Sequence, residues 1–164
     1  MSVVGIDLGN LASYIAVARN RGIDVIANEV SNRDTPSLVS FGPKQRSLGE
    51  PAKTQETSNF KNTVGSLKRL IGRTLDDPEI QETEKRFVNS ELVDVDGEVG
   101  VRVNYKGEPQ CFSATQLMAM YLGKLRDTAA NELKAPVSDV VVSVPGWFND
   151  KQRRAMLDAC QLPT

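Results

Sequence analysis

The hydrophobic pattern of residues 3–18 predicts two β-strands joined by a tight turn at Gly9. Asp7 stands at the end of the first apolar run. Because glycine tolerates positive φ and a close approach to its backbone, successive N–H groups of this turn could face an anion such as phosphate. The Asp7 carboxylate would repel a phosphate unless a cation such as hydrated Mg²⁺ lay between them. A plain hairpin turn, in which Asp7 accepts hydrogen bonds from local N–H groups, is the alternative interpretation.

Further apolar runs predict strands over residues 23–28 and 37–41, separated by a turn-rich loop over residues 31–36. Residues 62–72 carry apolar side chains at helical spacing between a polar cap and a glycine, which predicts a helix. Lys68 lies at the edge of that apolar stripe, so its ammonium could extend into a neighbouring cleft. A solvated basic face, shared with the two arginines nearby, is the alternative that spacing alone favours.

The second half of the chain alternates strand and helix patterns. Residues 93–112 predict a small antiparallel meander with glycine turns. A capping box over residues 113–116 opens a long amphipathic helix that ends near Lys134. Residues 140–144 form an almost unbroken β-branched run, which predicts a central strand covered on both faces. A second capping pattern predicts a last helix that starts after Asn149.

The composition of the chain mainly excludes classes of partner and of functional site. The 164 residues suffice for one ordinary domain or one lobe of a larger one. The formal net charge is −1 and the basic residues are scattered, so we expect no nucleic-acid partner and no membrane partner. The chain has no histidine, and Cys111 and Cys160 are far apart, which excludes a Cys/His metal site and a His-assisted nucleophile. We expect two buried, reduced thiols in a cytoplasmic protein, with the nucleus as an alternative compartment.

Four blocks of residues resemble the N-terminal ATPase domain of the seventy-kilodalton heat-shock chaperones, in that family's order and at its spacing. The blocks are Val4-Gly5-Ile6-Asp7-Leu8-Gly9, Asn32-Arg33 with Thr35-Pro36-Ser37, Asn62-Thr63-Val64 with Lys68-Arg69-Leu70-Ile71-Gly72-Arg73, and Val142-Ser143-Val144-Pro145 with Phe148-Asn149-Asp150 and Gln152-Arg153. The resemblance implies an α/β lobe of the actin-like ATPase fold. It implies a ribonuclease-H-like sheet-and-helix layer from residues 1–38 and 113–164, with a smaller α+β unit inserted over residues 39–112.

The resemblance also implies an ATP or ADP site with Mg²⁺. In that reading Gly9, Asn10 and Leu11 form the first phosphate loop, and Asp7 holds Mg²⁺ through water. Lys68 matches the family's lysine that reaches the γ-phosphate and positions the attacking water, so Lys68 and Asp7 are the expected catalytic residues.

Two further residues match the family's relay between the nucleotide site and the surface where partners dock. These are Pro145 and Arg153. A strand stop at Pro145 and a first-turn surface position for Arg153 are the plainer interpretations.

The phosphate loop departs from the chaperone pattern, because Asn10, Leu11 and Ala12 stand where two threonines and a tyrosine are usual. Asn10 and two further segments resemble the hundred-and-ten-kilodalton branch, especially its fungal members. The segments are Ala16-Val17-Ala18-Arg19-Asn20-Arg21-Gly22-Ile23 and Asn28-Glu29-Val30-Ser31-Asn32-Arg33. That branch implies a nucleotide-exchange partner of the seventy-kilodalton chaperones and a holdase for unfolded polypeptides, with weak or no ATP hydrolysis. A fully active chaperone ATPase and a nucleotide-independent, partner-binding decoy are the alternatives.

The chain stops where the family's sequence continues, after residues 160–164. We therefore expect a truncated chain that holds half of the nucleotide site and lacks the rest of the ATPase domain and the peptide-binding domain. Unfolded clients are then expected only for the full-length protein. Apolar surface left bare by the missing strands would make the chain prone to aggregate.

Overall fold

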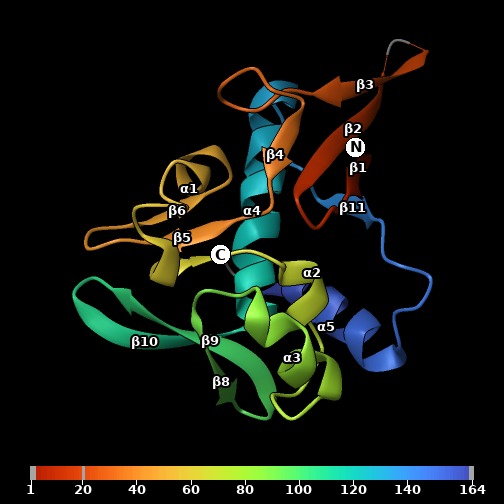
Figure 1. Ribbon diagram of the computed structural model, residues 1–164. Helices are drawn as coiled ribbons and strands as arrows, with labels where there is room; N and C mark the ends of the chain where they lie inside the picture. Colours follow the sequence, from red (N-terminus) through yellow and green to blue (C-terminus); the bar gives the residue numbers. More distant parts are fainter. Residues whose placement is uncertain (1–2, 20, 163–164) are drawn as a thin grey trace.

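The computed structural model describes residues 3–19 and 21–162 of the chain (Figure 1). Its first sheet has five strands in the order β11-β1-β2-β3, with β4 paired to β2. The strands are β1 (Val3–Asp7), β2 (Ala12–Arg19), β3 (Gly22–Ile26), β4 (Asp34–Pro36) and β11 (Asp139–Val142). The predicted hairpin is confirmed, because β1 and β2 pair antiparallel with Gly5 opposite Ala16. β11 joins β1 in parallel, which makes the layer a mixed α/β sheet.

Two long helices begin at the capping boxes that the sequence predicts. α4 (Ala114–Leu133) is capped by Ser113, and α5 (Asp150–Gln161) by Asn149. The side chains that alternate along the first sheet toward the helices are buried, including Val4, Ile6, Ile15, Val17 and Ile26. On the opposite face Val3, Tyr14 and Val25 are exposed, so within the described residues the helices cover one face of this sheet.

Two smaller three-stranded sheets come from the middle of the chain. One is ordered β6-β5-β7 and the other β10-β9-β8. Their strands are β5 (Val39–Phe41), β6 (Arg46–Leu48), β7 (Thr63–Val64), β8 (Glu91–Val95), β9 (Glu98–Tyr105) and β10 (Glu108–Ser113). Phe41 stacks on Phe112 with ring centroids 4.7 Å apart, which joins the two sheets. α4 runs alongside strands of all three sheets, as Figure 1 shows. The division into a core layer and an inserted unit stays a prediction.

The predicted helix over residues 62–72 is wrong. A short 3₁₀ turn (Phe60–Asn62) leads into β7, and the α-helix is only α2 (Leu67–Leu70). Val64 pairs with Val39 in a sheet, and Ser66 takes a left-handed φ of 55° directly before α2. Tertiary pairing with β5 thus overrides the helical spacing of the apolar residues. The other short helices are α1 (Glu50–Lys53), α3 (Pro78–Glu82) and a 3₁₀ turn (Glu84–Arg86).

Three other expectations are corrected. β11 lies at the edge of the sheet, with Val141 64% exposed, and is not covered on both faces. Cys111 and Cys160 are exposed free thiols and not buried ones. The loop expected over residues 31–36 contains β4, because Thr35 pairs with Ser13. No helix in the described part of the chain is long and apolar enough to cross a membrane.

Candidate functional site

A cleft of about 680 Å³ lies where the turn after β1, the α2 helix and the segment after β11 meet. Its lining comprises Asn10, Lys68, Arg69, Arg73, Glu79, Glu84, Ser143, Val144, Pro145 and Trp147. Three of the residues singled out in the sequence, Asn10, Lys68 and Pro145, therefore line one cleft although they are far apart along the chain.

Lys68 reaches the β1 turn from α2. Its ammonium donates a hydrogen bond to the carbonyl oxygen of Leu8, the residue between Asp7 and Gly9. Among residues 3–19 and 21–162 no carboxylate forms an ion pair with Lys68, whereas both neighbouring arginines have carboxylate partners. Lys68 therefore presents a positive charge to the cleft that acidic side chains do not neutralise. Such a charge favours a bound anion.

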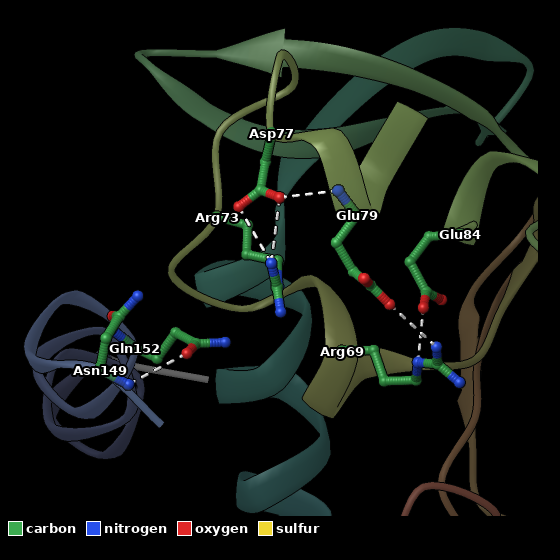
Figure 2. A network of polar contacts seen from close by, with 7 residues as sticks. All are labelled: Arg69, Arg73, Asp77, Glu79, Glu84, Asn149 and Gln152. Carbon is green, nitrogen blue, oxygen red and sulfur yellow. Dashed lines mark hydrogen bonds and ion pairs between the residues drawn. The ribbon is translucent and has the colours of Figure 1, made fainter. Parts of the chain in front are cut away.

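The neighbouring arginines hold the wall of the cleft together (Figure 2). The Arg69 guanidinium lies between Glu79 and Glu84, with its Nε 2.5 Å from the Glu84 Oε1. Glu84 is 1% exposed, so this pair fixes a buried charge. These contacts contradict the solvated basic face that the spacing favours.

Arg73 forms a second anchor in the same wall. Its Nη1 contacts both carboxylate oxygens of Asp77 at 3.1 and 2.9 Å. Asp77 also caps α3 by accepting from the Glu79 N–H at 2.9 Å. The two arginines thus tie α2 to α3 and leave Lys68 as the cleft's unneutralised cation among the described residues.

Asp7 lies exposed at the end of β1, with its carboxylate held from β11. Ser143 Oγ donates to the Asp7 Oδ1 at 2.8 Å. The same hydroxyl oxygen accepts from the Leu8 N–H at 3.1 Å. In the described residues Asp7 accepts no hydrogen bond from the N–H groups of its own turn, which argues against the plain hairpin interpretation. Sequence reasoning missed Ser143, although a lone polar residue in the β-branched run 140–144 was the available signal.

The turn at Gly9 is held by hydroxyl groups beneath it. The Gly9 N–H donates to Ser13 Oγ at 3.3 Å, and Ser37 Oγ donates to the Gly9 carbonyl at 2.9 Å. A Cβ at Gly9 would lie 1.9 Å from the Ala12 carbonyl oxygen, so the close approach of these two backbone segments requires glycine here. The φ of Gly9 is not positive, so its backbone conformation is not the reason. The Gly9 N–H thus has a partner within the protein, and the place of Gly9 in a phosphate loop stays a prediction.

The free donors of the turn belong to the next two residues. No described residue accepts a hydrogen bond from the N–H of Asn10 or Leu11. Asn10 lines the main cleft and, with Leu11, a neighbouring hollow of about 190 Å³. The Leu11 side chain is 81% exposed, and its carbonyl accepts from the Ser37 N–H at 3.0 Å. Two backbone N–H groups, the Asn10 amide and the Lys68 ammonium are thus the anion donors that this turn offers.

A buried hydroxyl cluster, formed by Ser13, Ser37 and Tyr121, supports the turn from α4. Ser13 and Ser37 lie 3.0 Å apart through their Oγ atoms. The Tyr121 hydroxyl donates to the Thr35 carbonyl at 2.8 Å. Burial raises the pKa of Tyr121, and the hydrogen bonds to the two serines lower it by less, so the phenol stays neutral near pH 7. The sequence offered no signal that would separate these hydroxyls from ordinary core positions.

Pro145 and Arg153 contact one another directly. Arg153 Nε donates to the Phe148 carbonyl at 3.0 Å, and its Nη2 lies 3.5 Å from the Pro145 carbonyl and 3.4 Å from that of Gly146. Arg153 therefore fixes the turn that joins β11 to α5. Arg153 is nevertheless an exposed residue in the first turn of α5, so its role in a relay stays a prediction.

The described residues contain no group of three or more His, Cys, Asp or Glu side chains that could hold a metal ion. Asp7 is a single carboxylate, held at one oxygen by Ser143. Such a donor fits Mg²⁺ that takes most of its ligands from water and phosphate oxygens, which is common for this ion. It does not fit a metal centre built from protein side chains alone.

Comparison with known proteins places these features in a wider context. The family model described as Hsp70 protein matches residues 3–163. Heat shock protein hsp88 of Neurospora crassa is 62% identical over 162 residues, which cover 99% of this chain and 23% of that protein. A heat shock protein homolog of Candida glabrata is 53% identical, and one of Saccharomyces cerevisiae is 52% identical, each over 159 residues that cover 96% of this chain and 23% of the relative. The chain thus spans 23% of the length of these relatives.

Proposed function

The chain belongs to the Hsp70 family, with fungal heat-shock relatives of the hundred-and-ten-kilodalton type, and we propose that it supplies the first phosphate-binding half of an ATP site. The observation that carries the proposal is the Lys68 ammonium, which lacks a carboxylate partner among the described residues and borders the Gly9 turn. Asn10 and Leu11 would add the N–H donors that face phosphate oxygens.

Asp7 is the proposed contact for Mg²⁺. When bound with ATP, the ion would neutralise phosphate charge next to this carboxylate. Asp7 would orient water of the ion's shell through one carboxylate oxygen, while Ser143 bonds to the other. Lys68 would hold positive charge beside the terminal phosphate, the position where negative charge develops in phosphoryl transfer.

The proposed role of the whole protein is nucleotide exchange on a seventy-kilodalton chaperone, together with holding unfolded polypeptides. Hydrolysis is expected to be weak, because Asn10 and Leu11 replace side-chain hydroxyls at the phosphate turn. In this role ATP holds a conformation, and the contact between Pro145 and Arg153 passes that conformation to the partner surface. The division into a core layer (residues 1–38 and 113–164) and an insert (residues 39–112), and a cytoplasmic location, are part of the proposal.

The test measures release of a fluorescent ADP analogue from a seventy-kilodalton chaperone after addition of the complete protein that contains this chain. We expect faster release, and we expect ATP to be needed for it. Release at the spontaneous rate would overturn the exchange role. Insensitivity of partner binding to both ATP and Asp7→Ala would favour the nucleotide-independent decoy instead.

An active ATPase is the second candidate, because Asp7 and Lys68 are both present and both border the turn. Steady-state phosphate release separates it from the exchange role. Robust turnover that Lys68→Ala abolishes would support the active ATPase.

A further inference from the structure

Ser143 joins three features of the site through one residue. Its backbone N–H donates to the Ile6 carbonyl at 2.9 Å, which continues the pairing of β11 with β1. Its hydroxyl accepts from the Leu8 N–H and donates to Asp7 Oδ1. The Ser143 hydroxyl therefore both accepts and donates a hydrogen bond next to the turn that follows β1.

The Leu8 peptide is held from two sides as a result. Its N–H is bound by Ser143 from β11, and its C=O by Lys68 from α2. The backbone between Asp7 and Gly9 is thus clamped between two segments that are distant in the sequence. A carboxylate at the exposed end of a strand would otherwise rotate freely about its side-chain bonds.

We infer that Ser143 is a positioning residue that sets the Asp7 carboxylate for a hydrated Mg²⁺ ion bound with ATP. The inference rests on the proposed nucleotide site and adds a residue and a role to it. Ser143 bonds to one oxygen of the exposed Asp7 carboxylate, and no described residue donates to the other, to which water of the ion's shell can bind. Without the hydroxyl, the carboxylate loses its fixed orientation and the Leu8 N–H loses its acceptor.

Ser143 also links this carboxylate to the turn at Pro145, two residues further along the chain. The Pro145 carbonyl lies 3.5 Å from the Arg153 guanidinium, so two residues of backbone separate the Asp7 contact from the contact to α5.

The test compares ATP affinity with and without Mg²⁺ in the complete protein, by titration calorimetry, for the unmodified protein and four variants. In Ser143→Ala we expect the gain in affinity from Mg²⁺ to shrink about tenfold, the order of one charge-assisted hydrogen bond. Affinity for metal-free ATP should change less than about twofold, because the hydroxyl acts on the carboxylate and not on phosphate. The matched control is Ser138→Ala, since Ser138 lies before the same strand and bonds only to Asp139 among the described residues.

A second pair of variants guards against a folding defect. Ser143→Thr and Ser143→Val have nearly the same shape and differ in the hydroxyl, so we expect the Mg²⁺ gain to be kept in the first and lost in the second. Equal Mg²⁺ gains in this pair, or an unchanged gain in Ser143→Ala, would overturn the inference and leave the proposed site standing. An unmodified protein that binds no ATP in either condition would overturn the proposed function together with the inference.

Discussion

Gly72 lies directly against Gln152, so that a Cβ on Gly72 would come within 2.5 Å of the Gln152 Cα. Gly72 follows α2, which carries Lys68, and Gln152 is in the first turn of α5. Figure 2 shows the Gln152 side chain extending from α5 toward the segments that carry Arg69 and Arg73. This contact sets how near the helix of Lys68 can lie to the segment that follows β11.

Gly72→Ala is expected to destabilise the chain more than its backbone strain alone would. Its φ of +69° costs alanine about 1–2 kcal/mol, and the collision with backbone atoms adds about 1–3 kcal/mol. Gly97→Ala is the matched control, since Gly97 has a φ of +82° and no atom near its missing Cβ. Thermal melts of both variants measure the difference, and equal losses in the two would contradict the packing argument.

Lys68→Ala is expected to weaken ATP binding to the complete protein by roughly tenfold to a hundredfold, the range of a hydrogen bond to a charged group. The reason is that no other cation of the cleft is free of a carboxylate partner among the described residues. Lys44→Ala removes an exposed charge elsewhere and serves as the control. Equal affinity in the two variants, measured by calorimetry, would place the phosphates away from Lys68.

Tyr121→Phe is expected to cost about 1 kcal/mol at pH 7, because it removes the hydrogen bond to the Thr35 carbonyl beneath the turn. The pKa of Tyr121 is raised above its ordinary value of 10.0, with burial as the main cause. The folded state therefore holds the phenol proton more tightly than the unfolded state does. The contribution is fully present below about pH 10 and is lost as the pH rises further.

Denaturant unfolding of both proteins across this alkaline range provides the check. The stability difference between wild type and Tyr121→Phe should shrink as the pH rises above 10, because only the wild type carries the raised pKa. A difference that stays constant would show that this phenol does not titrate with unfolding.

Local patterns carried most of what could be predicted from the sequence. The β1–β2 hairpin, the meander and both capping boxes depend on residues a few positions apart, so alternation, turn glycines and Ser or Asn caps were sufficient signals. The helix over residues 62–72 failed because pairing of Val64 with a distant strand competes with helical spacing. The strand predicted over residues 140–144 forms as β11, but its predicted central position is wrong, since a β-branched run does not reveal how many neighbours a strand has.

The candidate site shows the same contrast between local sequence patterns and contacts across long sequence separations. The pattern of residues 3–18 indicated Asp7 and Gly9, and the family resemblance added Lys68 to the same site. The Ser143 contact joins positions 136 residues apart, and Ser37 reaches Tyr121 across 84 positions. Because these partners are so far apart in the sequence, only the folded arrangement shows which groups the hydroxyls contact.

The Arg69–Glu84 pair is expected to be strongly coupled. Removing one partner leaves the other in a low-dielectric wall, whereas removing both leaves no stranded charge. We expect Arg69→Met to lower the free energy of unfolding by about 2 kcal/mol, below the range for fully buried pairs because Arg69 is 39% exposed. Arg69→Met with Glu84→Met should recover part of that loss. A double-mutant cycle by urea unfolding measures the coupling, and simple additivity would contradict it.

Val141→Lys is expected to reduce self-association of this chain. In the described residues β11 pairs with β1 on one side only, and Val141 is 64% exposed, so an apolar strand presents unpaired backbone groups to another chain. A lysine on such an edge opposes strand addition by charge repulsion and by its need for solvent. The cost to folding should be small, since the Val141 side chain is mostly in water already.

Val30→Lys is the matched control for Val141→Lys, because Val30 is 52% exposed but lies in a loop outside the sheet. Sedimentation velocity over a range of concentrations measures the outcome. If the unmodified chain remains a monomer throughout and melts cooperatively, the free edge does not drive association and the expected aggregation is wrong.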